Sequence, residues 1–240
     1  MKVQTIKNEL SNPNNYRGLT PVMLLYFAGM ALFFFLLLPY AFEVLGEVFF
    51  PKKLTMWHQL ALYKWTAIGC ALYVFLRRHM KNVSLLEAFS HESTHMIVAL
   101  LFRRRIHAFA CKDDGSGIIS TSGNNKLGEF LMTLAPYCLP ICTYVLLFIR
   151  PHIYYNSLWA FDLFIGLSMA FHYYCFKSQT NICQPDIQQY PPIFSMLFII
   201  TTTLMNLCII WVCYLPKYPL LSSIWRLVTA VYENFIGIFI

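Results

Sequence analysis

Long apolar stretches separated by short polar connections dominate the pattern of this chain. Five of them approach the roughly 20 mostly apolar residues that an α-helix needs to cross a bilayer: 21–42, 59–76, 127–149, 156–176 and 193–215. A sixth, 84–102, is apolar but also contains ionisable residues. Pro136 and Pro140 interrupt one stretch and predict a kink there. The pattern predicts an all-α polytopic membrane protein with about six transmembrane helices, forming a single membrane-embedded domain over 1–240.

The two ends of the chain differ from these stretches. Residues 1–20 form a polar tail without the apolar core of a signal peptide, so we expect the first apolar stretch to remain in the mature protein. Residues 219–240 contain Arg226 and Glu233 among apolar residues. The pattern of residues 219–240 fits either a final span or a helix that lies in the membrane interface. Little chain is left between the spans, so we expect no second folded domain.

Residues 106–122 break the helical pattern. Two short runs that favour β-structure flank the turn residues Asp113, Asp114, Gly115 and Gly117. This order predicts a small β-hairpin directly after the stretch 84–102. Because unpaired backbone cannot face lipid, we expect the hairpin to pack against the helices or to lie at the interface. An exposed strand edge there could pair with an extended peptide.

Composition agrees with a membrane location. Of the 240 residues, 58% are hydrophobic and 12% are charged, whereas charged residues make up about 25% of a typical soluble domain. The net charge of +7 comes from Lys and Arg at the ends of the apolar stretches, where they anchor helices in a bilayer, so we expect no nucleic-acid partner. The basic tail favours a cytoplasmic N-terminus. The triplet Arg103–Arg105 breaks the alternation, so either the preceding helix stops short of a full crossing or this topology is wrong.

The motif His91-Glu92-x-x-His95 lies inside the apolar stretch 84–102. On a helix, the two imidazoles share one face and can bind one Zn²⁺, while the Glu between them can take a proton from zinc-activated water. Ionisable residues in an apolar helix are costly and usually mark a functional site. The alternative is a structural role, in which the two histidines bond to neighbouring backbone or a Glu–His pair joins two spans.

A catalytic zinc site needs a third protein ligand and one open position. Leu101 occupies the place where a common soluble class has its third His, which excludes that class. The aspartates that follow the motif are the remaining candidates. Asp113 and Asp114 are explained by the turn that they form, which leaves Asp162 and Asp186.

Two of the candidate ligands also have structural explanations. Asp186 precedes a predicted helix, and Gln189 follows it three residues later, so Asp186 could instead cap that helix. His172 lies inside the stretch 156–176. It is an alternative ligand or a residue that positions the substrate, and its structural alternative is a packing residue with a satisfied hydrogen bond.

At these residues the chain resembles the site-2 protease type of intramembrane zinc metalloprotease, particularly its short members without an inserted regulatory domain. The likeness rests on the motif, on Ala99-Leu100-Leu101 with a basic residue at 103, on Asp114-Gly115-Ser116-Gly117, on Gly123 and the Pro-containing stretch, and more weakly on Gly166, Phe171-His172 and Gln184-Pro185-Asp186-Ile187. The resemblance implies one Zn²⁺ per chain, held by His91, His95 and Asp186. It also implies that Glu92 is the general base and that a hairpin follows the motif helix.

The resulting prediction is an intramembrane zinc metalloendopeptidase in a multi-pass membrane protein, in the cell (inner) membrane if the source is bacterial. The resemblance implies a membrane-anchored protein as the substrate, cut in or near its transmembrane segment. The alternative function is a non-catalytic polytopic membrane adaptor or assembly protein. A metal transporter ranks last, because the other apolar stretches offer few ligands that could line a path. The sequence makes no prediction of the oligomeric state.

Overall fold

The computed structural model describes residues 16–49, 61, 63–80, 83–112, 116–214 and 220–237. Contacts between residues divide the chain into two compact units. Unit 1 comprises Met1–Gly29, Lys81–Leu139 and Cys175–Thr203, and unit 2 comprises Met30–Met80, Pro140–Tyr174 and Leu204–Ile240. Three of the five boundaries fall within helices, and these three helices therefore contribute residues to both units.

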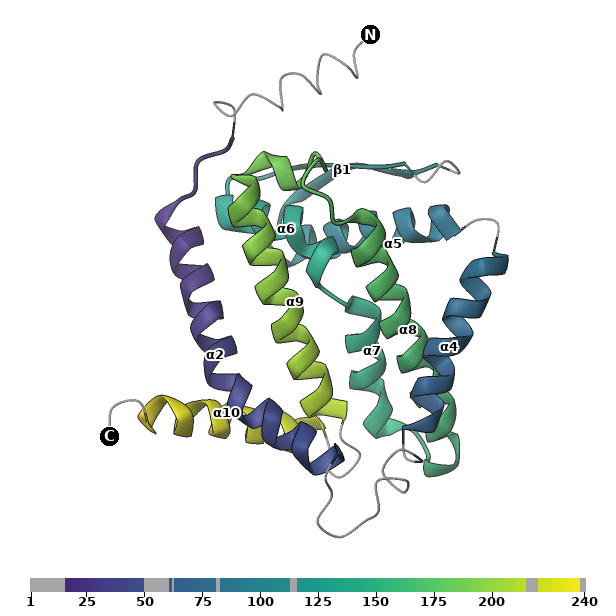
Figure 1. The fold of residues 1–240 in the computed structure, drawn as a ribbon. Helices are drawn as coiled ribbons and strands as arrows, with labels where there is room; N and C mark the ends of the chain where they lie inside the picture. Colours follow the sequence, from purple (N-terminus) through teal and green to yellow (C-terminus); the bar gives the residue numbers. More distant parts are fainter. Residues whose placement is uncertain are drawn as a thin grey trace. The chain divides into compact units, whose positions relative to one another are not determined.

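The described chain is mostly helical, with one small antiparallel sheet (Figure 1). The helices are α2 (Pro21–Phe49), α4 (Lys64–His79), α5 (Val83–Leu101), α6 (Lys126–Cys138), α7 (Ile141–Ile149), α8 (Leu158–Gln179), α9 (Pro192–Tyr214) and α10 (Leu220–Gly237). The strands are β1 (Arg105–Cys111) and β2 (Gly117–Ser122), and short 3₁₀ turns include η4 (Ile187–Gln189). The predicted helical fold with a hairpin after the motif helix is confirmed.

The described residues support only part of the predicted set of membrane spans. In the part of the chain that the structure describes, two helical segments are long and apolar enough to cross a membrane, Pro21–Gly46 and Pro192–Tyr214. A third is added if Lys126–Cys138 and Ile141–His152, bent by 80°, form one broken span. This bend confirms the kink predicted from the prolines, because a proline removes a helical hydrogen bond. The expected six spans are not confirmed. One reason is length, since α4 has 16 residues in the described part of the chain and a span needs about 20.

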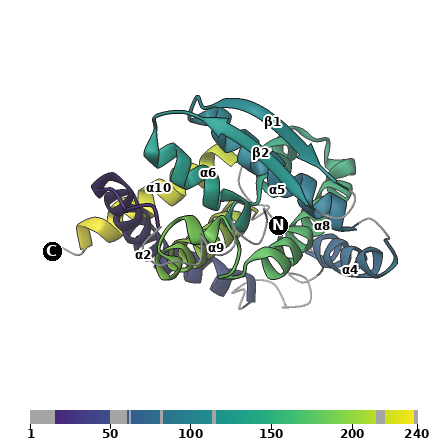
Figure 2. The same cartoon turned by 90° about the horizontal axis from the view of Figure 1, so that it is seen from above.

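Unit 1 is built around the motif helix α5, which contacts α6 and both strands. The two strands run side by side across α5 (Figure 2). They pair in an antiparallel register that joins Phe109 to Ile119, with an irregularity between Ile106 and Ala108. On α6, Phe130 is fully buried, and its ring lies 5.0 Å from the ring of Tyr190. Aromatic packing therefore holds the chain that follows α8 against α6.

In unit 2, α4 and α8 approach closely at two glycines. A Cβ atom at Gly69 would overlap the backbone carbonyl of Leu163, and one at Gly166 would overlap the carbonyl of Thr66. The thiol of Cys70 donates a hydrogen bond of 3.2 Å to the Gly166 carbonyl oxygen. Small residues at a helix crossing let two backbones come together, which is a common way of packing helices in membranes.

Candidate metal centre

Helix α5 places its ionisable side chains on the face that the rest of unit 1 covers. Glu87, Glu92 and His95 are buried, and His95 is only 4% exposed. The Nε2 atoms of His91 and His95 lie 3.1 Å apart. Residues four apart on a helix share one face, so this arrangement follows directly from the motif spacing.

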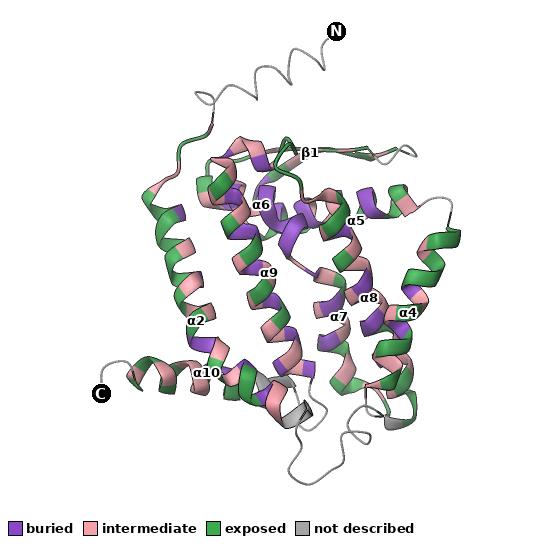
Figure 3. Cartoon of the chain, in the orientation of Figure 1, coloured by how far each residue is buried: buried purple, intermediate pink, exposed green. Residues whose placement is uncertain are grey.

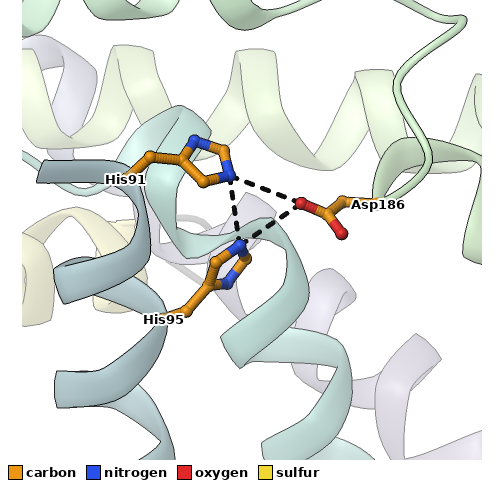
Figure 4. A group of neighbouring side chains, drawn as sticks. All are labelled: His91, His95 and Asp186. Carbon is orange, nitrogen blue, oxygen red and sulfur yellow. Dashed lines mark hydrogen bonds and ion pairs between the residues drawn. The ribbon is translucent and has the colours of Figure 1, made fainter. Parts of the chain in front are cut away.

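Asp186 joins the two histidines from the loop that follows α8 (Figure 4). Its Oδ2 atom lies 3.4 Å from His91 Nε2 and 3.3 Å from His95 Nε2. Among the described residues, these three form a group that could hold a metal ion, with the ligand atoms all within 4.8 Å of one another. Asp186 stands at the N-cap of η4, yet its side chain makes no capping hydrogen bond. The Gln189 amide donates to the other oxygen, Oδ1, at 3.3 Å.

Hydrogen bonds to the far side of each imidazole turn its Nε2 atom toward Asp186. His95 Nδ1 donates to the Met132 carbonyl oxygen at 2.7 Å, and His91 Nδ1 donates to Gln179 Oε1 at 3.0 Å. A metal-binding histidine typically donates its other ring N–H in this way. Two imidazole lone pairs and a carboxylate oxygen thus face one another, which requires a proton or a cation among them.

The spacing of the three ligand atoms fits zinc. Their separations are 3.1, 3.3 and 3.4 Å. Ligands at the corners of a tetrahedron around Zn²⁺, at about 2.0–2.1 Å from the ion, are about 3.3–3.4 Å apart. Two imidazoles and one carboxylate are also a donor set found in catalytic zinc sites, which keep a fourth position open.

The electrostatics of Asp186 agree with a ligand role. Burial alone would raise the pKa of the Asp186 carboxyl, but its hydrogen bonds with His91 and His95 and its electrostatic interaction with them outweigh burial. Together they hold this pKa well below its usual range. Asp186 is therefore ionised at neutral pH, in the form that binds a metal ion.

Glu92 lies next to β2. A Cβ atom at Gly117 would overlap Glu92 Cγ and its carboxyl group, so any larger residue there would force the Glu92 side chain to move. Glu92 is buried and interacts electrostatically with His91, His95 and Asp186. The hairpin therefore limits where the Glu92 carboxyl group can lie beside the three candidate ligands.

Tyr137 is a member of the site that the sequence did not single out. Its hydroxyl donates to Asp186 Oδ2 at 3.2 Å, and its ring lies edge-on to His91 with the centroids 5.1 Å apart. Tyr137 is 1% exposed, so packing holds it in this position. In the sequence it is one aromatic residue in the apolar stretch between Pro136 and Pro140, and nothing local distinguishes it from the others.

A backbone hydrogen bond and ion pairs hold the loop that contains Asp186 in position. The backbone N–H of Arg17 donates to the Gln189 carbonyl oxygen at 2.8 Å, and the Arg17 side chain pairs with Glu129 on α6. Buried Arg104 lies 3.7 Å from the same carboxylate. The polar segment before α2 thus joins α6 to this loop.

The structure does not bring the other predicted candidates into this group. His172 belongs to unit 2, where it is partly buried and its buried Nε2 atom has no hydrogen-bond partner among the described residues. Asp162, also in unit 2, accepts a hydrogen bond of 2.8 Å from Arg150, so an ion pair accounts for its charge. Asp113 and Asp114 lie outside the described residues.

Comparison with known proteins identifies a family. Residues 65–182 match the family described as Peptidase M50B-like, while no curated protein and no solved structure matches the chain. The matched segment includes α5, the hairpin and α6, and it ends before Asp186. The predicted resemblance is thereby confirmed, and residues 65–182 are a Peptidase M50B-like domain of the site-2 protease family.

Proposed function

We propose that this protein is an intramembrane zinc metalloendopeptidase that hydrolyses a peptide bond in or near the transmembrane segment of a membrane-anchored protein. The convergence of His91, His95 and Asp186 carries the proposal. The Peptidase M50B-like family supports a peptidase, and the two or three candidate spans support a membrane protein.

Each residue of the site has a role in this proposal. His91, His95 and Asp186 hold one Zn²⁺. When bound, zinc supplies Lewis-acid chemistry, lowering the pKa of water and polarising a peptide carbonyl. Glu92 takes the proton from the attacking water and then delivers it to the leaving amine. Tyr137 holds the Asp186 carboxylate in place through its hydroxyl, and Gln179 and Met132 orient the two imidazoles.

The hairpin supplies a route for the substrate. The described sheet has two strands, so each strand has an edge that no other described strand covers. A peptide bond inside a helix is protected by its own hydrogen bonds, and it becomes accessible when the helix unwinds. The unwound segment then pairs with an edge of the hairpin as an added strand, which brings extended backbone beside Glu92.

Metal content tests the proposal directly. Elemental analysis of the detergent-purified protein is expected to give about one zinc per chain, and the double variant His91→Ala/His95→Ala is expected to give none. A chelator should remove both the zinc and the proteolysis, and added zinc should restore both. If the freshly purified protein contains no zinc and takes up none on reconstitution, the non-catalytic adaptor function replaces this proposal.

Gly117→Ala tests how the hairpin positions the general base. The added methyl group overlaps the Glu92 carboxyl group, so Glu92 must shift. A misplacement of about 1 Å can cost about 100-fold in rate, and we expect a loss of this order with zinc content unchanged. The measurement is the cleavage rate together with elemental analysis of the same sample.

Gly29→Ala is the matched control, because a methyl group there meets nothing within 4 Å. We expect it to cleave at the wild-type rate. If Gly117→Ala also cleaves at the wild-type rate, contact with β2 does not position Glu92. If it loses zinc, the substitution acts on the ligands and not on the base.

A further inference from the structure

Helix α10 has a buried face that packs within unit 2. Leu227 forms a buried cluster with Leu37 and Val44 of α2 and Val212 of α9, and Val231 packs against this cluster. The Asn234 side chain donates a hydrogen bond of 2.9 Å to the Leu36 carbonyl oxygen. These contacts fix which side of α10 faces the other helices of unit 2.

Roughly a third of a turn around the helix from this face, α10 carries a second apolar surface, which we call the outer stripe. It consists of four large side chains spaced i, i+3, i+7 and i+10: Trp225, Val228, Tyr232 and Phe235. Each is between 41% and 71% exposed. Figure 3 colours several segments of α10 as exposed. Large contiguous apolar surfaces of this kind mark sites of contact with membranes or other proteins.

Its direction and its contacts place α10 at the end of a candidate span. It runs crosswise to α9 in both Figure 1 and Figure 2. The cluster that contains Leu227 includes Val212 of α9, two residues before α9 ends at Tyr214, and α9 is one of the candidate spans. If α9 spans the membrane, the hydrocarbon layer ends near its last residues, which would put the Leu227 cluster near the level where the lipid headgroups begin.

We propose that α10 lies in the plane of the membrane interface, with the outer stripe inserted at the boundary between lipid headgroups and acyl chains. Trp and Tyr favour this depth because each has an apolar ring and a polar group. Arg226 and Glu233 are exposed and would be costly in a span, but both can reach water from an interfacial helix. This proposal concerns membrane topology and does not depend on the proposed function.

Depth measurements by spin labelling in phosphatidylcholine–phosphatidylglycerol vesicles test the proposal. Labels at the four outer-stripe positions are expected to report one shallow depth. The matched controls are four exposed α9 positions with the same spacing: Leu197, Ile200, Leu204 and Leu207. Because a helix rises about 1.5 Å per residue, labels on a spanning α9 should differ in depth by up to about 15 Å.

Three outcomes would overturn the proposal. A depth gradient along α10 like that of α9 would make it a final span. Water accessibility at all four outer-stripe positions would remove the lipid contact. Coupling between labels of two chains, without lipid contact, would mean that a second copy covers the outer stripe.

A second measurement keeps the native cysteines. Single-label variants require a background without the eight cysteines, and that background could fail to fold. Tryptophan fluorescence of the unaltered chain, minus that of Trp225→Phe, isolates the signal of Trp225. We expect lipids brominated near the headgroup to quench this signal more than lipids brominated near the chain ends. The reverse order would contradict an interfacial α10.

Discussion

Glu92→Gln is expected to abolish proteolysis while the protein keeps one zinc per chain. Glutamine preserves the size of the side chain but cannot accept a proton, and general acid–base catalysis contributes about 10²–10⁴-fold to rate. The ligands His91, His95 and Asp186 are unchanged, so metal content should not fall. The substrate is unknown, so the assay uses vesicles that contain the membrane proteins of the source cell. Wild type or the variant is added to these vesicles, and the new protein termini that appear in the two samples are compared.

Glu87→Gln is the matched control for this variant. Glu87 is also a buried carboxylate on α5, one turn before His91, but it accepts a hydrogen bond of 3.2 Å from the Ser178 hydroxyl, which lies outside the ligand group. We expect this variant to produce the same new termini as wild type. If Glu92→Gln produces them too, Glu92 is not the general base, and the adaptor function gains support.

Asp186→Ala is expected to remove most of the bound zinc. It leaves two imidazoles as protein ligands, and a catalytic zinc site normally has three. Mutation of a residue that hydrogen-bonds a metal ligand typically lowers metal affinity by roughly 10–100-fold. Loss of the ligand Asp186 itself should lower zinc affinity by more than this. Tyr137→Phe should fall within that smaller range, because it removes the hydroxyl that holds Asp186 and keeps the ring against His91. Competition with a chelator of known affinity measures both.

The relative zinc affinities of these variants decide whether Asp186 is a ligand. Asp162→Asn is the control, since its carboxylate pairs with Arg150 and lies outside the ligand group, and it should bind zinc like wild type. If Asp186→Ala also binds zinc like wild type, Asp186 only shapes its loop. If Tyr137→Phe has no effect on zinc affinity, the hydroxyl does not position the ligand.

Most local features of this fold could be predicted from residues that are adjacent in the sequence. The hairpin follows from turn residues between two runs that favour β-structure, and the bend after α6 follows from Pro136 and Pro140. The face shared by His91 and His95 follows from helix geometry alone. The membrane spans were harder to count, since an apolar stretch as long as α5 or α8 predicts a buried helix as well as a spanning one.

The sequence by itself determined the features that depend on a few adjacent residues: the motif, its helix, the hairpin and the kink. Only the tertiary structure brought Asp186 to His91, 95 residues earlier in the chain, and added Tyr137 to the site. Among the described residues, the ligand group does not include Asp162 or His172. Contacts between distant segments depend on how whole helices pack. A carboxylate before a helix has the same local sequence whether it caps that helix or faces two imidazoles.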